Sequence, residues 1–307
     1  MVKTGAPATP VMLTLTTLNL TGTSPTANFT GTSLGLTGAN SRVIIPGTLT
    51  GFMGSQYHAG NEWAKYDATQ DLLFDLGVTP FVAGDYNATN TAEAAWVAGQ
   101  QVKQSGAGLP ALTANRTADR FNFQTTAANQ SLNVAGFVLT AAQGGIISSA
   151  QTIGFTDGAT AAVPTATAGL TAGTIAPAQL YVHANAQIDI RTPVRNNLGL
   201  DGAIGGGDDN MVDFVKSGTG TVRLIHQDFP VGTATGALAI NPYTATPWTS
   251  TLTGSWIVND GRLEVHRGAF LGGRPVVLNG GHNAGLGTME ITTATISGGS
   301  VAIDRSA

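Results

Sequence analysis

In Gly220-Thr221-Val222-Arg223-Leu224, apolar residues alternate with polar ones, and Arg262-Leu263-Glu264-Val265 and Gln187-Ile188-Asp189-Ile190 repeat the alternation. A period of two is typical of a β-strand that buries one face. Similar short segments recur from about residue 111 onward and also between Val11 and Ile45, with glycine or asparagine at the turns between them. The sequence therefore predicts an all-β protein.

The spacing of the segments narrows the fold class further. Like elements return at irregular intervals on the order of 20 to 30 residues, which is the range of solenoid coils. A flat β-sandwich also has many short strands. We favour a β-solenoid because the turn and strand units recur without long hydrophilic connections, and because glycine and asparagine stand where corners require a positive φ.

The composition agrees with a buried aliphatic core beneath an uncharged surface. Only 10% of the residues are charged, against about 25% in an average soluble domain, while 42% are hydrophobic. A net charge of −4 argues against nucleic acid as a partner. The chain has no cysteine, which excludes disulfides, thiolate metal sites and a cysteine nucleophile. No apolar run approaches the roughly 18 residues of a membrane span.

Three regions are expected. Residues 1–45 are predicted to form solenoid strands, 46–104 an insert or lateral loops rich in aromatic and acidic residues, and 105–307 the main solenoid. The insert holds three of the five Tyr, two of the four Trp and a third of the acidic residues. Within it, the stretch from Asp67 to Leu76 is predicted to form one or two helical turns, or otherwise loops and short strands.

One part of the main solenoid resembles a known family. Val215-Lys216-Ser217-Gly218-Thr219-Gly220-Thr221-Val222-Arg223-Leu224 is similar to the opening of the autotransporter-associated β-strand repeat, and Gly254 to Val265 is similar to its second half. Ala269-Phe270-Leu271-Gly272 matches the usual ending, so the defined motif spans 212–272. Between Leu224 and Gly254 the chain departs from the family pattern, with a longer stretch that contains Pro230, Pro242 and Pro247.

The resemblance implies a right-handed parallel β-helix that is exported to the bacterial cell surface or beyond it, as part of a larger precursor or by a signal that this sequence does not contain. We expect a structural or adhesive segment that is not an enzyme and holds no cofactor. Its expected partners are copies of itself, adjoining repeats of a longer chain, and surface glycans. Two alternatives stay open: a fibre or sheath subunit that stacks coil on coil, and a polysaccharide lyase or hydrolase built on a β-helix.

A glycine-rich acidic stretch is the candidate for metal binding or for carboxylate chemistry. Asp201, Asp208, Asp209 and Asp213 stand around Gly205-Gly206-Gly207, and oxygen ligands separated by glycines suit calcium. The stretch lacks the D-x-[DN]-x-[DN]-G frame and a downstream bidentate Glu, so we favour a solvated corner loop. The five histidines are isolated from one another in the sequence, and no serine stands in a nucleophile elbow.

The aromatic residues of the insert have two interpretations. Exposed, the rings could stack on sugars or contact a protein; buried, they would form the small core that holds the insert together. We favour burial. The candidate binding surface on the first interpretation consists of Tyr57, Trp63, Tyr66, Tyr86 and Trp96.

Overall fold

The computed structural model describes residues 11–20, 24–38, 40–71, 74–148, 151–156, 168–173, 178–201, 207–224, 248–265, 269–279, 288–291 and 301–304. The chain is all-β, as predicted, and its larger sheets consist of parallel strands. In the described ranges, helical geometry is limited to two three-residue 3-10 turns, Ala83–Asp85 and Glu93–Ala95. None of the described helices is long and apolar enough to cross a membrane.

The chain divides into two compact units, residues 1–86 and 87–307. This division differs from the expected boundaries at 45/46 and 104/105. The strands before residue 46 and most of the expected insert form unit 1 together, while the remainder of that insert belongs to unit 2. The reason is strand pairing, because β2 (Ala27–Asn28) is hydrogen-bonded to β5 (Tyr57–Ala59) and the two segments cannot fold as separate regions.

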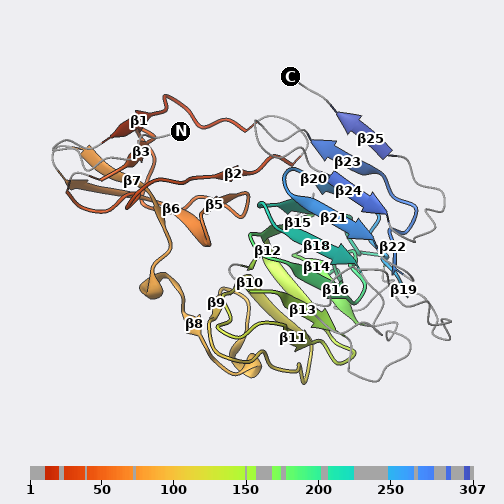
Figure 1. Cartoon of the computed structure of the whole chain (residues 1–307). Coiled ribbons are helices and arrows are strands. Elements are labelled where there is room, and N and C mark those ends of the chain that lie inside the picture. Colours follow the sequence, from red (N-terminus) through yellow and green to blue (C-terminus); the bar gives the residue numbers. More distant parts are fainter. Residues whose placement is uncertain are drawn as a thin grey trace. The chain divides into compact units, whose positions relative to one another are not determined.

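Unit 2 contains two sheets whose paired strands are all parallel (Figure 1). Sheet I has ten strands: β8 (Ala88–Thr89), β9 (Gln101–Gln104), β10 (Arg116–Phe123), β12 (Val138–Ser148), β14 (Gly169–Ala172), β15 (Ala178–Ala184), β17 (Val212–Ser217), β20 (Trp256–Val258), β23 (Val276–Asn279) and β25 (Val301–Asp304). Sheet II has six: β11 (Gln130–Asn133), β13 (Ile153–Thr156), β16 (Ile188–Arg191), β18 (Thr221–Leu224), β21 (Arg262–Val265) and β24 (Thr288–Ile291). A further parallel pair joins β19 (Trp248–Thr249) to β22 (Ala269–Phe270).

The chain passes back and forth between the two sheets. From β10 to β18 each numbered strand of sheet I is followed by one of sheet II, apart from the short β14, and each strand pairs with the next strand of its own sheet. Parallel strands cannot be joined by a tight hairpin, so the chain must travel before it returns. Here the return path includes a strand of the other sheet.

Period-two alternation explains which side chains are buried. Ile188, Val222 and Leu263 are register partners in sheet II, and all three are fully buried in one hydrophobic cluster. Phe214 and Trp256 are register partners in sheet I, with ring centroids 4.9 Å apart. The cluster includes apolar residues from both sheets, so the same side of each sheet faces a common core. The strands expected around these residues are confirmed.

Unit 1 has a different architecture. β1 (Met12–Thr14) pairs in parallel with β3 (Arg42–Ile44). A second sheet contains β2, β5, β6 (Glu62–Asp71), β4 (Gly51–Phe52) and β7 (Phe74–Pro80), and apart from the parallel β2–β5 pair its strands are antiparallel. A hydrophobic cluster made of residues from both sheets forms the core of the unit.

Of the two interpretations of Asp67 to Leu76, the helical turns are wrong and the alternative with strands is confirmed, because the described residues belong to the antiparallel β6–β7 pair. Ala64, Tyr66 and Ala68 stand at every second position of β6, and all three pack on the unit 1 core. A strand brings alternate residues to one face, whereas a helix would spread them around its axis. Burial of this face therefore favours the hairpin over local helix formation.

Candidate functional site

The five aromatic residues proposed as a binding surface are all buried. Their exposed fractions are 9% for Tyr57, 0% for Trp63, 0% for Tyr66, 6% for Tyr86 and 1% for Trp96. The first four lie in unit 1, whereas Trp96 packs edge-on against Phe121 in the core of unit 2, with ring centroids 5.5 Å apart. The interpretation that the structure supports is the buried one, and these rings do not form a shared surface.

The acidic residues of the candidate calcium stretch contact different parts of the chain. Asp201 and Asp208 are exposed, and Asp209 and Asp213 are partly exposed. Asp208 Oδ2 accepts hydrogen bonds from the amides of Leu200 (2.6 Å) and Asp201 (3.3 Å). Asp213 Oδ1 instead accepts the amide of Ser255, directly before β20, at 2.7 Å. Among the described residues no group of three metal-ligating side chains is found, and 202–206 of this stretch lie outside them.

A pocket of about 360 Å³ lies in unit 1. Its walls come from the segment after β2, from the corner between β5 and β6, and from the last residue of β7. The lining residues are Phe29, Thr30, Gly31, Ser33, Leu34, Leu36, Ala59, Gly60 and Pro80. No charged side chain is among them. The pocket therefore combines apolar walls with two hydroxyl groups, which suits an uncharged ligand better than an ion.

The loop that forms one wall of this pocket is held in a compact conformation. Gly35 N donates to Ser41 O at 2.9 Å, and Ser41 N donates to Thr32 O at 3.4 Å. Gly35 has a φ of +67°, and a Cβ at this position would overlap the Thr79 side chain on β7. Glycine is required here because the backbone is left-handed and lies directly on the neighbouring strand. The loop can thus approach β7 closely and present Leu34 and Leu36 to the pocket.

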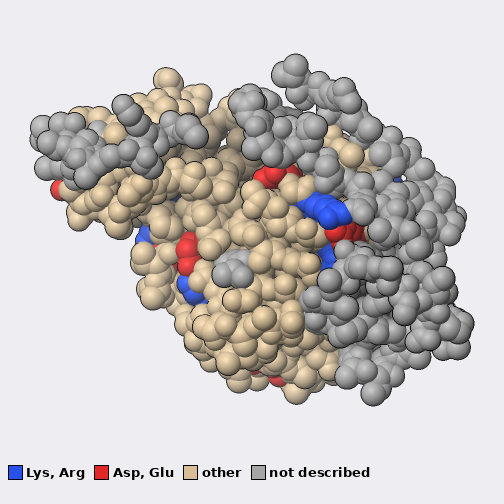
Figure 2. Space-filling model, in the orientation of Figure 1, with Lys and Arg blue, Asp and Glu red and all other residues tan. Residues whose placement is uncertain are grey.

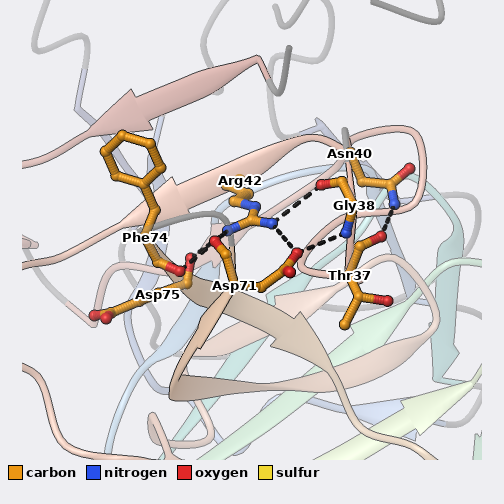
Figure 3. A network of polar contacts seen from close by, with 7 residues as sticks. All are labelled: Thr37, Gly38, Asn40, Arg42, Asp71, Phe74 and Asp75. Carbon is orange, nitrogen blue, oxygen red and sulfur yellow. Dashed lines mark hydrogen bonds and ion pairs between the residues drawn. The ribbon is translucent and has the colours of Figure 1, made fainter. Parts of the chain in front are cut away.

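Arg42 anchors the other end of the loop (Figure 3). Its side chain has no exposed area, and its guanidinium donates to four backbone carbonyl oxygens: those of Gly38 (3.0 Å), Asp71 (2.7 Å), Phe74 (3.1 Å) and Asp75 (3.2 Å). It also forms an ion pair with Asp71 Oδ2 at 2.6 Å. The planar fork of five donors allows one arginine to join the loop to the turn region of the β6–β7 hairpin.

Asp71 completes this anchor from the hairpin side. Its Oδ2 accepts the Gly38 amide at 2.6 Å in addition to the Arg42 guanidinium. The Gly38 amide and, after it, Arg42 hold the pKa of Asp71 below its ordinary value despite partial desolvation. Nearby, Tyr66 Oη donates to Asp75 Oδ2 at 2.8 Å, and burial together with this carboxylate raises the pKa of Tyr66 to about 12. Four of the five guanidinium N–H directions of Arg42 are thus engaged in contacts that position the pocket wall, while its Nε is buried without a hydrogen-bond partner among the described residues.

Sheet II carries a ladder of buried charges on the side opposite its apolar residues. Asp189, Arg223 and Glu264 are register partners on three successive strands, and each is at most 4% exposed. Arg223 holds Asp189 with two bonds of 2.7 Å, and Arg262 pairs with Glu264 at 2.9 Å. Both carboxylate oxygens of Asp189 are thus occupied by the Arg223 guanidinium, in a strong bidentate contact between neighbouring strands.

Lys216 is an ionisable residue inside the core of unit 2. It has no exposed area, and its register partners are Val182 and Val258. Its Nζ donates to the carbonyl oxygens of Gly218 and Asp260, the latter at 2.7 Å. Burial lowers the pKa of Lys216 to about 7, and the charge of Asp260 opposes this shift only in part. The amine thus links the segments that follow β17 and β20.

Sequence reasoning did not identify the pocket, the Arg42 anchor or the role of Lys216. For Lys216 the sequence did contain a signal. Val212, Phe214 and Lys216 stand at alternate positions of one strand, which places Lys216 on the same face as two apolar residues. Of the histidines, His183 is buried and its Nδ1 is hydrogen-bonded to Ser217 Oγ, and its ring stacks on Tyr181. His226, His266 and His282 lie outside the described residues.

Comparison of the chain with protein-family models, with curated proteins and with solved structures finds no match. The resemblance to the autotransporter-associated repeat therefore stays a prediction, carried by the residues of 212–272.

Proposed function

We propose that the chain is a non-catalytic structural or adhesive segment of a bacterial surface protein, in which unit 2 is a right-handed parallel β-helix. The observation that carries this proposal is the continuous in-register parallel pairing of the two sheets. In sheet II, Gly154, Asp189, Arg223 and Glu264 follow one another as register partners, and each step advances the chain by a few tens of residues. A chain that returns to the same register after visiting the second sheet describes a coil. The handedness follows from the general rule that about 98% of parallel crossovers are right-handed.

A stack of coils suits a structural function. Each coil buries its apolar residues against its neighbours, so stability accumulates with length and the scaffold can be extended without a new core. The ion-paired ladder on sheet II adds contacts that cross from coil to coil. Among the described residues on the face shown in Figure 2, charged atoms form small groups separated by uncharged ones. Such a surface favours weak contacts through hydroxyls and amides over charge-specific binding.

The adhesive part of the proposal rests on the pocket of unit 1. Phe29 and Leu36 supply apolar contact area, while the hydroxyls of Thr30 and Ser33 can exchange hydrogen bonds with a neutral ligand. An uncharged surface glycan combines apolar ring faces with hydroxyl groups in this way. Binding at a single pocket of this kind is expected to be weak, and repeated copies on a surface would raise its avidity.

A glycan array followed by calorimetry tests this assignment. The wild-type chain is expected to retain neutral glycans, and Leu36→Asp to abolish the retention by placing a charge in the pocket. The matched control is Leu49→Asp, because Leu49 is 85% exposed and lies outside the pocket. Absence of glycan binding by the wild type, or equal loss with the Leu49 variant, would contradict the adhesive function. Sustained release of reducing ends or unsaturated sugars from a polysaccharide panel would contradict the non-catalytic assignment and favour the lyase or hydrolase alternative.

A further inference from the structure

β1 is an edge strand with an unusually apolar and accessible surface. Met12 is 38% and Leu13 45% exposed, and Thr14 is exposed as well. Of the described strands, only β3 pairs with it, along one edge. Among the large hydrophobic residues that are exposed in the described ranges, these two are consecutive in a strand, whereas Leu49 and Leu200 lie outside strands.

The backbone of β1 has one edge occupied and one edge open. Val11 O accepts Arg42 N at 2.9 Å, and Leu15 N donates to Ile44 O at 2.8 Å. Odd-numbered residues of β1 therefore direct their backbone groups toward β3, and Met12 and Thr14 direct theirs to the opposite edge. The described residues provide no strand that pairs with that edge. Unpaired N–H and C=O groups in an extended strand are a template for another strand.

The usual devices that protect an edge are missing from this strand. Natural edge strands carry lysine, proline or other charged residues that prevent pairing with a second chain. Here no Asp, Glu, Lys or Arg occurs between Lys3 and Arg42, and β1 contains no proline. An edge without charge is equally compatible with a copy of itself, because no like charges meet when two such strands pair.

We propose that the open edge of β1 pairs with β1 of a second copy of this chain, in antiparallel orientation about a two-fold axis at Leu13. In this register Met12 of each copy faces Thr14 of the other, and these two residues carry the outward-directed backbone groups. Leu13 faces Leu13 across the axis, and Val11 faces Leu15. Every open backbone group of the strand gains a partner, and each contact joins apolar or hydroxyl side chains.

The pairing is weak and reversible because β1 is three residues long. Its contact area lies well below the roughly 1,200 Å² of a stable interface, so the dimer is expected only at high protein concentration. Such an interface is effective where many copies are held close together, as on a surface. It uses unit 1 and thus differs from stacking of coils through the ends of unit 2.

Sedimentation velocity of the full chain tests the pairing from about 10 µM to about 1 mM, the range in which weak association is detected. The wild type is expected to shift reversibly from monomer to dimer. Leu13→Lys places two like charges across the axis and is expected to weaken the dimer about 5-fold, which corresponds to the upper magnitude of a cross-strand pair interaction. The matched control Leu49→Lys introduces the same charge at an exposed position outside β1 and is expected to leave the dimer unchanged.

A covalent readout remains informative even if Leu13→Lys impairs folding. The chain has no cysteine, so Leu13→Cys introduces a single thiol. Directly opposed residues of a non-hydrogen-bonded antiparallel pair have Cα atoms about 4.5 Å apart, which is within disulfide range. Under mild oxidation Leu13→Cys is expected to form a covalent dimer rapidly and Leu49→Cys slowly. A wild type that stays monomeric at about 1 mM would overturn the proposal. Equal cross-linking of the two cysteine variants, or a dimer insensitive to Leu13→Lys, would overturn it as well.

Discussion

Replacement of Lys216 by methionine is expected to remove a steep dependence of stability on pH. Lys216 lies in the core of unit 2 with no exposed area, and its Nζ donates to the carbonyl oxygens of Gly218 and Asp260. Its pKa is about 7 in the folded chain, against an ordinary value of 10.5. Lys216→Met keeps the length and apolar stem of the side chain and deletes the titrating group.

Proton binding determines whether the free energy of unfolding rises or falls with pH. Between pH 7 and pH 10.5 the amine is protonated in the unfolded chain and mainly neutral in the folded one. Because the unfolded state binds more protons, the free energy of unfolding rises with pH across this window. Each unit of pKa difference corresponds to about 1.4 kcal/mol, so the slope approaches about 1.4 kcal/mol per pH unit and the full window amounts to about 5 kcal/mol. Below pH 7 both states are protonated and the contribution of Lys216 becomes constant.

Urea unfolding followed by tryptophan fluorescence measures this slope at several pH values across the window. The wild type is expected to gain stability as the pH rises, and Lys216→Met to show a much flatter profile. The control Lys103→Met removes a lysine from β9 of the same unit, where the side chain is only partly buried, and is expected to keep the wild-type slope. Equal slopes for the wild type and Lys216→Met would refute the placement of a neutral amine in the core.

Three further substitutions address the packing and the ion pairs. Gly144→Ala is expected to destabilise unit 2 by more than about 2 kcal/mol in urea unfolding, because Gly144 has a φ of +73° and a Cβ would overlap a backbone oxygen of β15. The control is Gly99→Ala, at a φ of +87° with open space around it, which is expected to cost about 1 kcal/mol. Asp189→Asn is expected to lower the free energy of unfolding by about 3 to 5 kcal/mol, because it leaves a buried arginine without its carboxylate. The control is the exposed Asp208, where Asp208→Asn is expected to change the free energy of unfolding by less than about 1 kcal/mol. Arg42→Met is expected to lower the stability of unit 1 by about 3 kcal/mol, because four carbonyl oxygens lose their donor. Hydrogen exchange of the β7 amides measures this loss, and unchanged exchange would contradict the anchoring function of Arg42.

The strands of unit 2 could be predicted from sequence because alternation reports local burial. In Ile188-Asp189-Ile190 and Val222-Arg223-Leu224, every second residue is aliphatic and fully buried. The pairing of Asp189 with Arg223 could not be predicted in the same way. Register depends on the length and path of the connections between strands, and the spacing of like segments is irregular, so several alignments of two neighbouring strands satisfy the same alternation.

The pocket and its anchor were not accessible to local patterns. Phe29, Leu34 and Pro80 come from three separate segments, and only tertiary pairing brings them together. Arg42 contacts the turn region of a hairpin about thirty residues away in the sequence. The interpretation of Asp67 to Leu76 as helical turns failed for a related reason, since the core beneath β6 selects a strand over the weak local preference of this stretch.

The proposed coil of unit 2 requires the parallel register of sheet II, and a pair of engineered disulfides measures this register directly. Thr221 and Arg262 are register partners in the parallel β18–β21 pair, and the chain has no cysteine of its own. Paired residues of adjacent strands have Cα atoms about 4.8 Å apart, so Thr221→Cys with Arg262→Cys is expected to form an intramolecular disulfide on oxidation. An antiparallel pair of the same two strands would instead bring Leu224 opposite Arg262. Efficient cross-linking of Thr221→Cys/Arg262→Cys and none of Leu224→Cys/Arg262→Cys is the result that a parallel stack predicts, and the reverse outcome would contradict it.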